Sequence, residues 1–310
     1  MSSEEENTRV YVGSRGLLKS CVCKSFTPVS SLRKIINQRF TDLQDGDSIY
    51  ICSSALQDFV DNYLDKIRTK FVLVTGDSDA AIPVKALTEQ AFNRLIGSEF
   101  LLAWFSQNLV FSPKQYPKLR HLPIGLDYHT LASQNHSWGP RSSPKTQEDL
   151  LFAVAKKAKP FYERPAKAYT TFHFELGRGG RQQAYNQIPR ELIHYEPEKT
   201  TRLVSWKNQS NYAFVASPPG EGLDCHRTWE ALCLGCIPIL LSTPLDDMFE
   251  DLPVLIVKSW TDVTQDLLET TVEDYKTREF RMEKLTLEYW VQQITASLVF
   301  PERSTKEIVK

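Results

Sequence analysis

The chain has 310 residues, of which 41% are hydrophobic and 24% charged, a composition typical of a globular protein that excludes a disordered one. Lys and Arg number 37 against 38 Asp and Glu, so no strong overall field draws this protein to nucleic acid or to an anionic membrane. At this length, two domains of about 150 residues each are expected, and any anionic ligand must be held by a local site.

The chain begins with a polar, acidic stretch, "MSSEEENTRV", which lacks the apolar core of a signal peptide. No run of 18 apolar residues occurs in the sequence. The six cysteines are scattered, and only Cys21 and Cys23 are close together, so we expect reduced thiols. These features predict a soluble, cytoplasmic protein without a membrane span; they do not predict its oligomeric state.

In the first half, short apolar runs alternate with amphipathic segments. The apolar runs lie at 47–52, 70–79, 99–111 and 119–127, and the amphipathic segments at 55–68 and 84–96. Such alternation predicts parallel βαβ units. Residues 134–149 are polar, contain two prolines and have no periodicity, which indicates a loop or linker. We therefore place a first domain at 1–145.

The second half repeats the pattern, with apolar runs at 168–176, 212–217, 236–242 and 253–257. A closing segment at 273–298 has helical spacing, and this final helix could pack back on the first domain. The second domain is placed at 146–310. We predict an α/β protein with two Rossmann-like parallel-sheet domains facing a central cleft, in which ligands bind beyond the carboxyl ends of the strands.

The segment "FVASPPGEGLDCHRTWEALCLGCIPILLS", 214–242, concentrates polar residues between a strand and a helix. Its Pro/Gly turn would let backbone approach a ligand, and Asp224 is a candidate N-cap. The helix N-terminus suits a diphosphate, Arg227 could add a bidentate contact, and Glu230 could bind ribose hydroxyls. Alternatively, Asp224 only caps the helix, and Arg227 and Glu230 form a surface ion pair.

This segment resembles the carboxyl-terminal signature of exostosin-type glycosyltransferases, with "GCIP" at 235–238. The segment "YTTFHFELGRGGRQQAY", 169–185, is similar to that family's aromatic strand, glycine turn and arginine. The resemblance implies a GT-B fold, a donor nucleotide sugar held mainly by the second domain, and an inverting, metal-independent transfer. It fits a soluble viral or bacterial-type relative best.

The resemblance also implies roles by position: Glu230 on ribose, Arg227 and Arg181 near the diphosphate, and the backbone of 218–222 around the sugar phosphate. Arg178, next to the glycine turn, is a second candidate; alternatively, this turn is merely solvated. The expected donor-binding residues are Arg178, Arg181, Pro218, Gly220, Glu221, Gly222, Asp224, His226, Arg227 and Glu230.

An inverting transfer needs a base for the acceptor hydroxyl, which we expect in the first domain. Asp77 and Asp79 follow an apolar strand, and Asp79 is favoured; either could instead cap a helix or stabilise the turn. His129 is a third candidate catalytic residue or an acceptor contact, although such a histidine is commonly structural.

Three residues are candidates for binding the acceptor. Asp127 accompanies His129 at the expected end of a strand, and Trp104 and Gln107 lie in "AWFSQN". The aromatic ring could stack on a sugar, although packing in the core is its alternative role.

The sequence thus predicts an inverting glycosyltransferase that moves a sugar from a nucleotide sugar to a hydroxyl of a glycan acceptor. The donor is expected to be a UDP-sugar, such as UDP-xylose or UDP-galactose, and no metal or other cofactor is expected. Asp77 and Asp79 also form a DxD pattern, so one alternative is a metal-dependent transferase. The other is a nucleotide- or carbohydrate-binding module without turnover.

Overall fold

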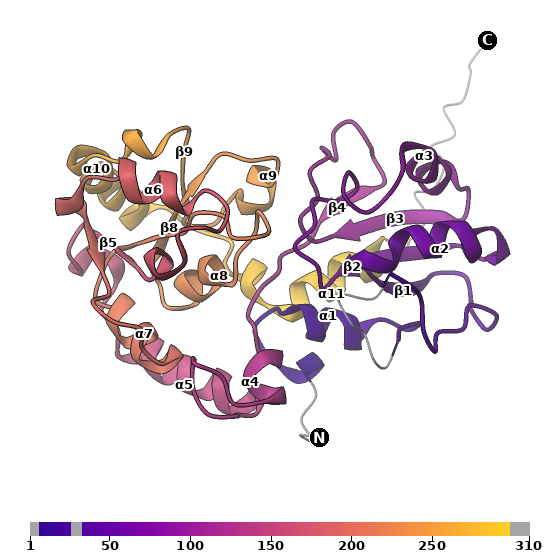
Figure 1. The fold of residues 1–310 in the computed structure, drawn as a ribbon, viewed down its shortest axis with the longest axis horizontal. Helices are drawn as coiled ribbons and strands as arrows, with labels where there is room; N and C mark the ends of the chain where they lie inside the picture. The colour runs from indigo at the N-terminus through magenta and orange to yellow at the C-terminus, as the bar shows by residue number, and fades with distance from the viewer. Residues whose placement is uncertain (1–5, 26–32, 298–310) are drawn as a thin grey trace, which may run out of the picture.

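Figure 1 shows the computed structural model of the chain, which describes residues 6–25 and 33–297. The structure contains a four-stranded and a five-stranded sheet, and every strand pair in both is parallel. Helices pack against each sheet (Figure 1). The predicted α/β class with two parallel sheets is therefore confirmed.

The first sheet has the order β1-β2-β3-β4, so each new strand lies beside the previous one. The strands are β1 (Asp47–Cys52), β2 (Phe71–Gly76), β3 (Leu101–Ser106) and β4 (Leu119–His121). All six residues of β2 are buried, as expected for a strand with a neighbour on each side and cover on both faces. Each apolar run of the first half therefore contains a strand; β1 matches its run, whereas β2, β3 and β4 are shorter than theirs. The run at 119–127 is a strand only over Leu119–His121, so Asp127 and His129 lie beyond the strand end rather than at it.

Five α-helices accompany the first sheet and the passage to the second. They are α1 (Ser14–Ser20), α2 (Leu56–Asn62), α3 (Glu89–Gly97), α4 (His129–Ser133) and α5 (Pro144–Lys157). The helix predicted at 84–96 starts only at Glu89, because the Thr88 hydroxyl accepts the N–H of Ala91 at 3.2 Å and caps α3 there.

The second sheet has the order β6-β5-β7-β8-β9, so the strand order changes direction between β5 and β7. The strands are β5 (Ala168–Thr170), β6 (Ile193–Tyr195), β7 (Phe214–Ala216), β8 (Ile237–Leu241) and β9 (Leu255–Val257). The predicted strand at 168–176 ends at Thr170 and passes into a 3-10 helix at Phe172–Glu175. Sequence patterns did not predict β6, which has only three residues.

The helices of the second half are α6 (Arg181–Gln187), α7 (Arg202–Gln209), α8 (His226–Cys233), α9 (Asp246–Phe249), α10 (Gln265–Thr277) and α11 (Leu287–Ala296). The closing segment, predicted as helical over 273–298, is therefore broken between α10 and α11. Thr286 ends the break by capping α11 through the N–H of Tyr289 at 3.2 Å. Residue 298 lies outside the described residues.

The last helix lies beside α1, under the first sheet (Figure 1). The N–H of Leu287 donates to the carbonyl of Val10, and the N–H of Val12 donates to the carbonyl of Leu285, both at 2.9 Å. The Leu287 side chain also packs so closely on Gly16 that a Cβ there would lie 2.9 Å from it. The beginning and the end of the described chain thus complete the first domain together.

The segment at 134–149, predicted as a loop or linker, ends at Ser143, where α5 begins. Ser143 caps this helix, and Pro144 occupies its first turn, where a missing N–H costs nothing. The predicted domain boundary after residue 145 thus falls inside α5. The carboxylate of Glu148 accepts the N–H groups of Val10 and Tyr11 at 2.9 and 3.0 Å, which ties α5 to the first domain.

One apolar cluster runs through both halves of the protein. It joins Val72 and Val74 of β2 to Val215 of β7, Trp229 of α8 and Trp290 of α11. Two further clusters fill the other faces of the two sheets. Because the two sheets share a core, packing restrains the position of one relative to the other.

Among residues 6–25 and 33–297, no helix combines the length and the apolar character that crossing a bilayer requires.

Candidate functional site

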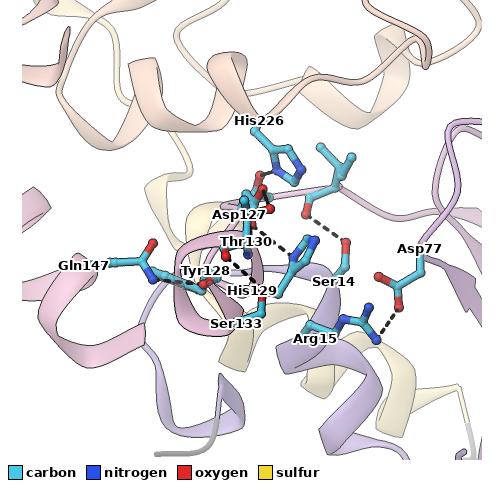
Figure 2. Close-up of polar contacts among 12 residues, drawn as sticks. Ser14, Arg15, Asp77, Asp127, Tyr128, His129, Thr130, Ser133, Gln147 and His226 are labelled. Carbon is cyan, nitrogen blue, oxygen red and sulfur yellow. Dashed lines mark hydrogen bonds and ion pairs between the residues drawn. The ribbon is translucent and has the colours of Figure 1, made fainter. Parts of the chain in front are cut away.

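The first group of polar residues lies at the carboxyl edge of the first sheet, where β2 ends. Asp77 has a left-handed backbone, with φ of 58°. Its carboxylate accepts the Tyr50 hydroxyl at 2.9 Å. It also pairs with Arg15 at 3.4 Å, as Figure 2 shows. Asp77 is therefore held by side chains of its own domain. Asp79 is exposed, and no described hydrogen bond or ion pair involves its carboxylate.

Two predicted acceptor contacts are internal, which corrects the expectation that they face a sugar. Trp104 is fully buried in the core, and its indole donates to the Thr75 hydroxyl at 2.9 Å. Gln107 is also buried; its amide donates to Ser14 at 2.9 Å and to the carbonyl of Pro123 at 2.8 Å. Gln107 holds the loop after β4 in place, and neither side chain can present itself to a ligand here.

Asp127 and His129 form a carboxylate–imidazole pair beyond β4 (Figure 2). Asp127 is buried, and its two oxygens accept the backbone N–H and the hydroxyl of Thr130 at 2.9 and 2.7 Å. His129 Nδ1 lies 3.1 Å from Asp127 Oδ1, and 39% of its side chain is exposed. Donation from Nδ1 leaves Nε2 as the acceptor, the arrangement that a histidine base requires.

The pKa values of this pair suit that role. Burial alone would raise the pKa of Asp127, but the charges of His226, His129 and Arg202 and the Thr130 hydrogen bond lower it to about 2. Burial lowers the pKa of His129; the Asp127 charge opposes this shift, and those of His226 and Arg15 add to it. At neutral pH, the pair is therefore a carboxylate beside a neutral imidazole.

Asp224 joins the two domains rather than capping α8. The helix begins at His226 with Cys225 at its N-cap, which corrects the predicted cap. The Asp224 carboxylate accepts the N–H of Ile124 at 2.7 Å and the indole N–H of Trp229 at 2.9 Å, and its own N–H donates to Asn108 at 3.0 Å. Burial raises the pKa of Asp224 to about 6, although these hydrogen bonds oppose the shift.

His226, the first residue of α8, also reaches the first domain (Figure 2). Its Nδ1 lies 2.7 Å from the carbonyl oxygen of Gly125. Gly125 has a φ of +64°, and a Cβ there would lie 2.1 Å from the carbonyl oxygen of Val12, so only glycine allows this loop to pass so close. His226 was predicted to bind the donor; the structure places it at the domain interface, close enough to act on the Asp127 carboxylate.

Two loops meet at the carboxyl edge of the second sheet. Gly179, with φ of +50°, approaches the 218–222 turn so closely that a Cβ would lie 2.3 Å from the carbonyl oxygen of Gly220. Arg181 begins α6, and its side chain is only 11% exposed. It pairs with Glu175 at 3.5 Å, and its buried Nε has no hydrogen-bond partner among the described residues.

Arg227 lies close enough to Arg181 for the charge of one to act on the other, and both act on the Cys225 thiol. The one described side-chain hydrogen bond of Arg227 is a long one, 3.4 Å, from Nη1 to the carbonyl of Pro218. Burial lowers the pKa of Arg227, and the charge of Arg181 adds to this effect. Glu175 pairs with Arg181 at 3.5 Å and with Arg178 at 3.0 Å, whereas no described ion pair involves Arg227. The positive charge of Arg227 is therefore available to an anion.

The remaining predicted residues of this edge differ in exposure, since Arg178 and Glu221 are exposed whereas Pro218 and Gly222 are buried. Arg178 is 53% exposed and pairs with Glu175 at 3.0 Å and with Glu221 at 3.9 Å. Gly222 packs on Asn108 of the first domain, with a Cβ position 3.0 Å from that amide. The predicted turn therefore touches both domains.

Glu230 has partners that sequence analysis did not reveal. Its Oε1 accepts Nε and Nη2 of Arg202 at 2.9 and 2.6 Å, and its Oε2 accepts the indole N–H of Trp206 at 3.0 Å. Arg202 also donates to the carbonyl of Asp127 and, at 3.0 Å, to Gln147. The predicted surface ion pair between Glu230 and Arg227 is not formed. A carboxylate has about four acceptor sites, so Glu230 retains little capacity for ribose hydroxyls.

Arg202 was missed because it lies in "EKTTRLVSW", where an arginine at the start of an amphipathic helix is typical of a solvated position. It is instead one of the buried charges of the protein. No pattern within that segment marks the pairing, since its partners are 28, 55 and 75 residues away.

No protein-family model matches this chain, and no curated protein matches it either. The resemblance to exostosin-type glycosyltransferases therefore stays a prediction. Within the described part of the chain, no three His, Cys, Asp or Glu side chains are grouped as they would be to hold a metal ion.

Proposed function

We propose that this protein is a glycosyltransferase that takes a sugar from a nucleoside diphosphate sugar, with a GT-B arrangement of its two domains. The observation that carries the proposal is the first turn of α8, which connects two chemically different groups. His226 reaches towards the Asp127–His129 pair, and the next residue, Arg227, faces Arg181 and the 218–222 turn.

The second-domain edge supports the anionic part of the donor. Arg181 and Arg227 supply two guanidinium groups, and the N-terminus of α8 adds unpaired backbone N–H groups. A diphosphate that leaves with developing negative charge is stabilised by such groups if they are already in place. In this proposal, these arginines take the part that a divalent cation plays in other transferases.

The first-domain edge supports the acceptor. His129 Nε2 accepts the proton of the acceptor hydroxyl, while Asp127 holds the ring and stabilises the imidazolium that forms. The acceptor oxygen then bonds to the anomeric carbon as the bond from that carbon to the diphosphate oxygen breaks. A single displacement of this kind inverts the anomeric configuration. His129 replaces Asp79 as the favoured base because a buried carboxylate orients it.

The diphosphate contact can be tested by measuring UDP affinity calorimetrically for the wild type, Arg181→Gln and Arg227→Gln, each with a chelator present. Losing one charged hydrogen-bond donor should weaken binding about 10- to 100-fold. Arg94→Gln is the matched control, because Arg94 forms an exposed ion pair with Asp65 at 2.8 Å in the first domain. GDP measured in parallel distinguishes the nucleobase.

If UDP and GDP both fail to bind folded wild-type protein, or if the arginine variants bind as well as Arg94→Gln does, the proposal is wrong. Binding that the chelator abolishes would point instead to a metal-dependent donor site. Once a donor is found, the anomeric configuration of the product, read by NMR, tests inversion.

A further inference from the structure

An exposed tryptophan, Trp138, lies next to the candidate site and takes no part in the chemistry proposed above. Trp138 lies in the segment between α4 and α5 and is 40% exposed. Single exposed apolar residues are common and carry no meaning by themselves. Trp138 differs from them in how firmly it is held and in what lies behind it.

Four contacts fix the position of Trp138. His136 and Gly139 exchange backbone hydrogen bonds at 3.0 and 2.9 Å, which closes a tight turn around it. The His136 ring packs edge-on against the indole, with centroids 4.4 Å apart. The backbone N–H of Trp138 donates to His136 Nδ1 at 3.3 Å, and its carbonyl accepts the N–H of Arg202 at 2.7 Å. The side chain is therefore preorganised, so binding through it costs little conformational entropy.

Trp138 is also connected to the reacting groups through one side chain. The guanidinium of Arg202 lies between two indoles, 6.0 Å from the centroid of Trp138 and 4.9 Å from that of Trp206. The same guanidinium donates to the carbonyl of Asp127 and to Glu230. Trp138 is thus linked through Arg202 to the backbone of Asp127, whose side chain belongs to the Asp127–His129 pair.

The surroundings of Trp138 suit a sugar. Gln134 and Asn135 carry exposed planar amides and directly precede the turn closed by His136 and Gly139; residues 134–141 together are called the 134–141 turn. The side-chain oxygen of Asn135 accepts the backbone N–H of Arg141 at 2.8 Å. The amide nitrogen of Asn135 is therefore the group that can donate to a ligand. A flat aromatic ring with amides beside it matches a pyranose, which has an apolar C–H face and a rim of hydroxyls.

We infer that Trp138 is the stacking platform for the acceptor sugar and that the 134–141 turn is a specificity-determining part of the acceptor site. The identity of this sugar as an acceptor rests on the proposed transferase function. The binding of a sugar to the turn does not.

The test is a binding experiment in which saturation-transfer NMR measures the affinity of the protein for four methyl glycosides. These are methyl β-galactoside, methyl β-xyloside, methyl β-glucoside and methyl α-fucoside. We expect at least one glycoside to bind the wild type. Trp138→Ala should weaken that binding about tenfold or more, since it removes an aromatic anchor, and Trp138→Phe should keep most of it. Tyr162→Ala, which removes a similarly exposed aromatic residue in the second half, should have no effect.

UDP affinity, measured on the same samples, reports separately on the donor site. Glycoside binding that depends on Trp138 without UDP binding would sustain the platform and contradict the transferase proposal. UDP binding with no glycoside bound, or with equal glycoside binding by wild type and Trp138→Ala, would overturn the platform and leave the transferase proposal standing.

Discussion

The carboxyl edges of the two sheets use opposite chemistry. At the first sheet, the polar side chains are hydrogen-bonded within the protein. Asp127 pairs with His129, and the amide of Gln107 donates to the carbonyl of Pro123 in the loop after β4. At the second sheet, the guanidinium groups of Arg181 and Arg227 lie beside two glycine-containing turns, and only Arg181 has a described ion pair. The difference teaches that two parallel sheets of similar topology can place different side-chain chemistry at their carboxyl edges. The proposed function assigns proton transfer to the first edge and anion binding to the second.

Two buried aspartates show the same contrast on a smaller scale. Asp127 and Asp224 both lie at the domain interface and are both almost inaccessible. The charges of His226, His129 and Arg202 outweigh burial and bring the pKa of Asp127 to about 2. Burial raises the pKa of Asp224 to about 6, because its hydrogen bonds and the charge of His226 alone do not outweigh it. Charge partners, and not burial alone, decide which of the two carboxylates is strongly acidic.

The largest effect is expected from His129→Gln, which breaks the contrast by removing the base while leaving the anion site intact. Loss of a general base lowers a transfer rate by about 10²- to 10⁴-fold. UDP affinity should stay within about threefold of the wild type, because no charged donor is lost. Steady-state rates and calorimetry measure the two quantities. The control is His194→Gln, at an exposed position of β6.

Full activity in His129→Gln would move the role of base to Asp79, the exposed carboxylate beyond β2. In the wild type, activity should fall as the pH is lowered through the pKa of His129, which burial places below its usual value.

The second effect concerns Glu230, which lies on α8 of the second domain. Arg202 donates both to Glu230 and to the carbonyl of Asp127, and so connects Glu230 to the first domain. Glu230→Gln leaves the charge of Arg202 buried without its ionised partner. The side chains of Arg202 and Glu230 are only 8% and 16% exposed, so water cannot take the place of the lost carboxylate charge. The unfolding free energy should fall by about 3–5 kcal/mol, measured by urea denaturation. Glu283→Gln, which breaks an exposed pair with Arg281, should leave the unfolding free energy nearly unchanged, because solvent screens that pair.

The double variant Arg202→Met/Glu230→Gln should recover part of the lost stability, since it removes the orphaned charge. A Glu230→Gln variant as stable as the wild type, with nucleotide affinity reduced, would instead favour the predicted ribose contact.

The smallest of the three effects sharpens the comparison of the aspartates through pH. The folded pKa of Asp224, about 6, lies above the ordinary value of 3.8, so the folded state binds this proton more tightly. The resulting stability, about 3 kcal/mol, is fully present below pH 3.8 and is lost as the pH rises through 6. Asp224→Asn should remove this dependence, so its stability relative to the wild type should rise by about 2 kcal/mol between pH 4.5 and 7.5, which is the part of the contribution lost within this range.

Asp127→Asn is the matched comparison, because the sign is reversed. The folded pKa of about 2 lies below 3.8, so its contribution is present above pH 3.8 and is lost only as the pH falls through 2. Its stability difference from the wild type should therefore be constant over the same pH range. Parallel curves for both variants, from urea titrations, would contradict the assignment of the two pKa values.

The strands were largely predictable, because a buried parallel strand reads as a short apolar run. The run "DSIYIC" became β1 residue for residue. The predictions were poorer where local signals compete. The 134–149 segment has the composition of a linker, but Ser143 and Pro144 start a helix within it, and Asp224 has the residue type of an N-cap but a partner in the other domain.

The sequence by itself determined the class of the fold and the loops where polar residues gather, since apolar periodicity and turn residues act within a few positions of the chain. Only the tertiary structure decided which of those residues meet. Asp224 finds Ile124 at a separation of 100 residues, and Glu230 finds Arg202 rather than its near neighbour Arg227. The physical reason is that a buried charge takes the partner that packing brings to it, and packing depends on all the elements around a shared core.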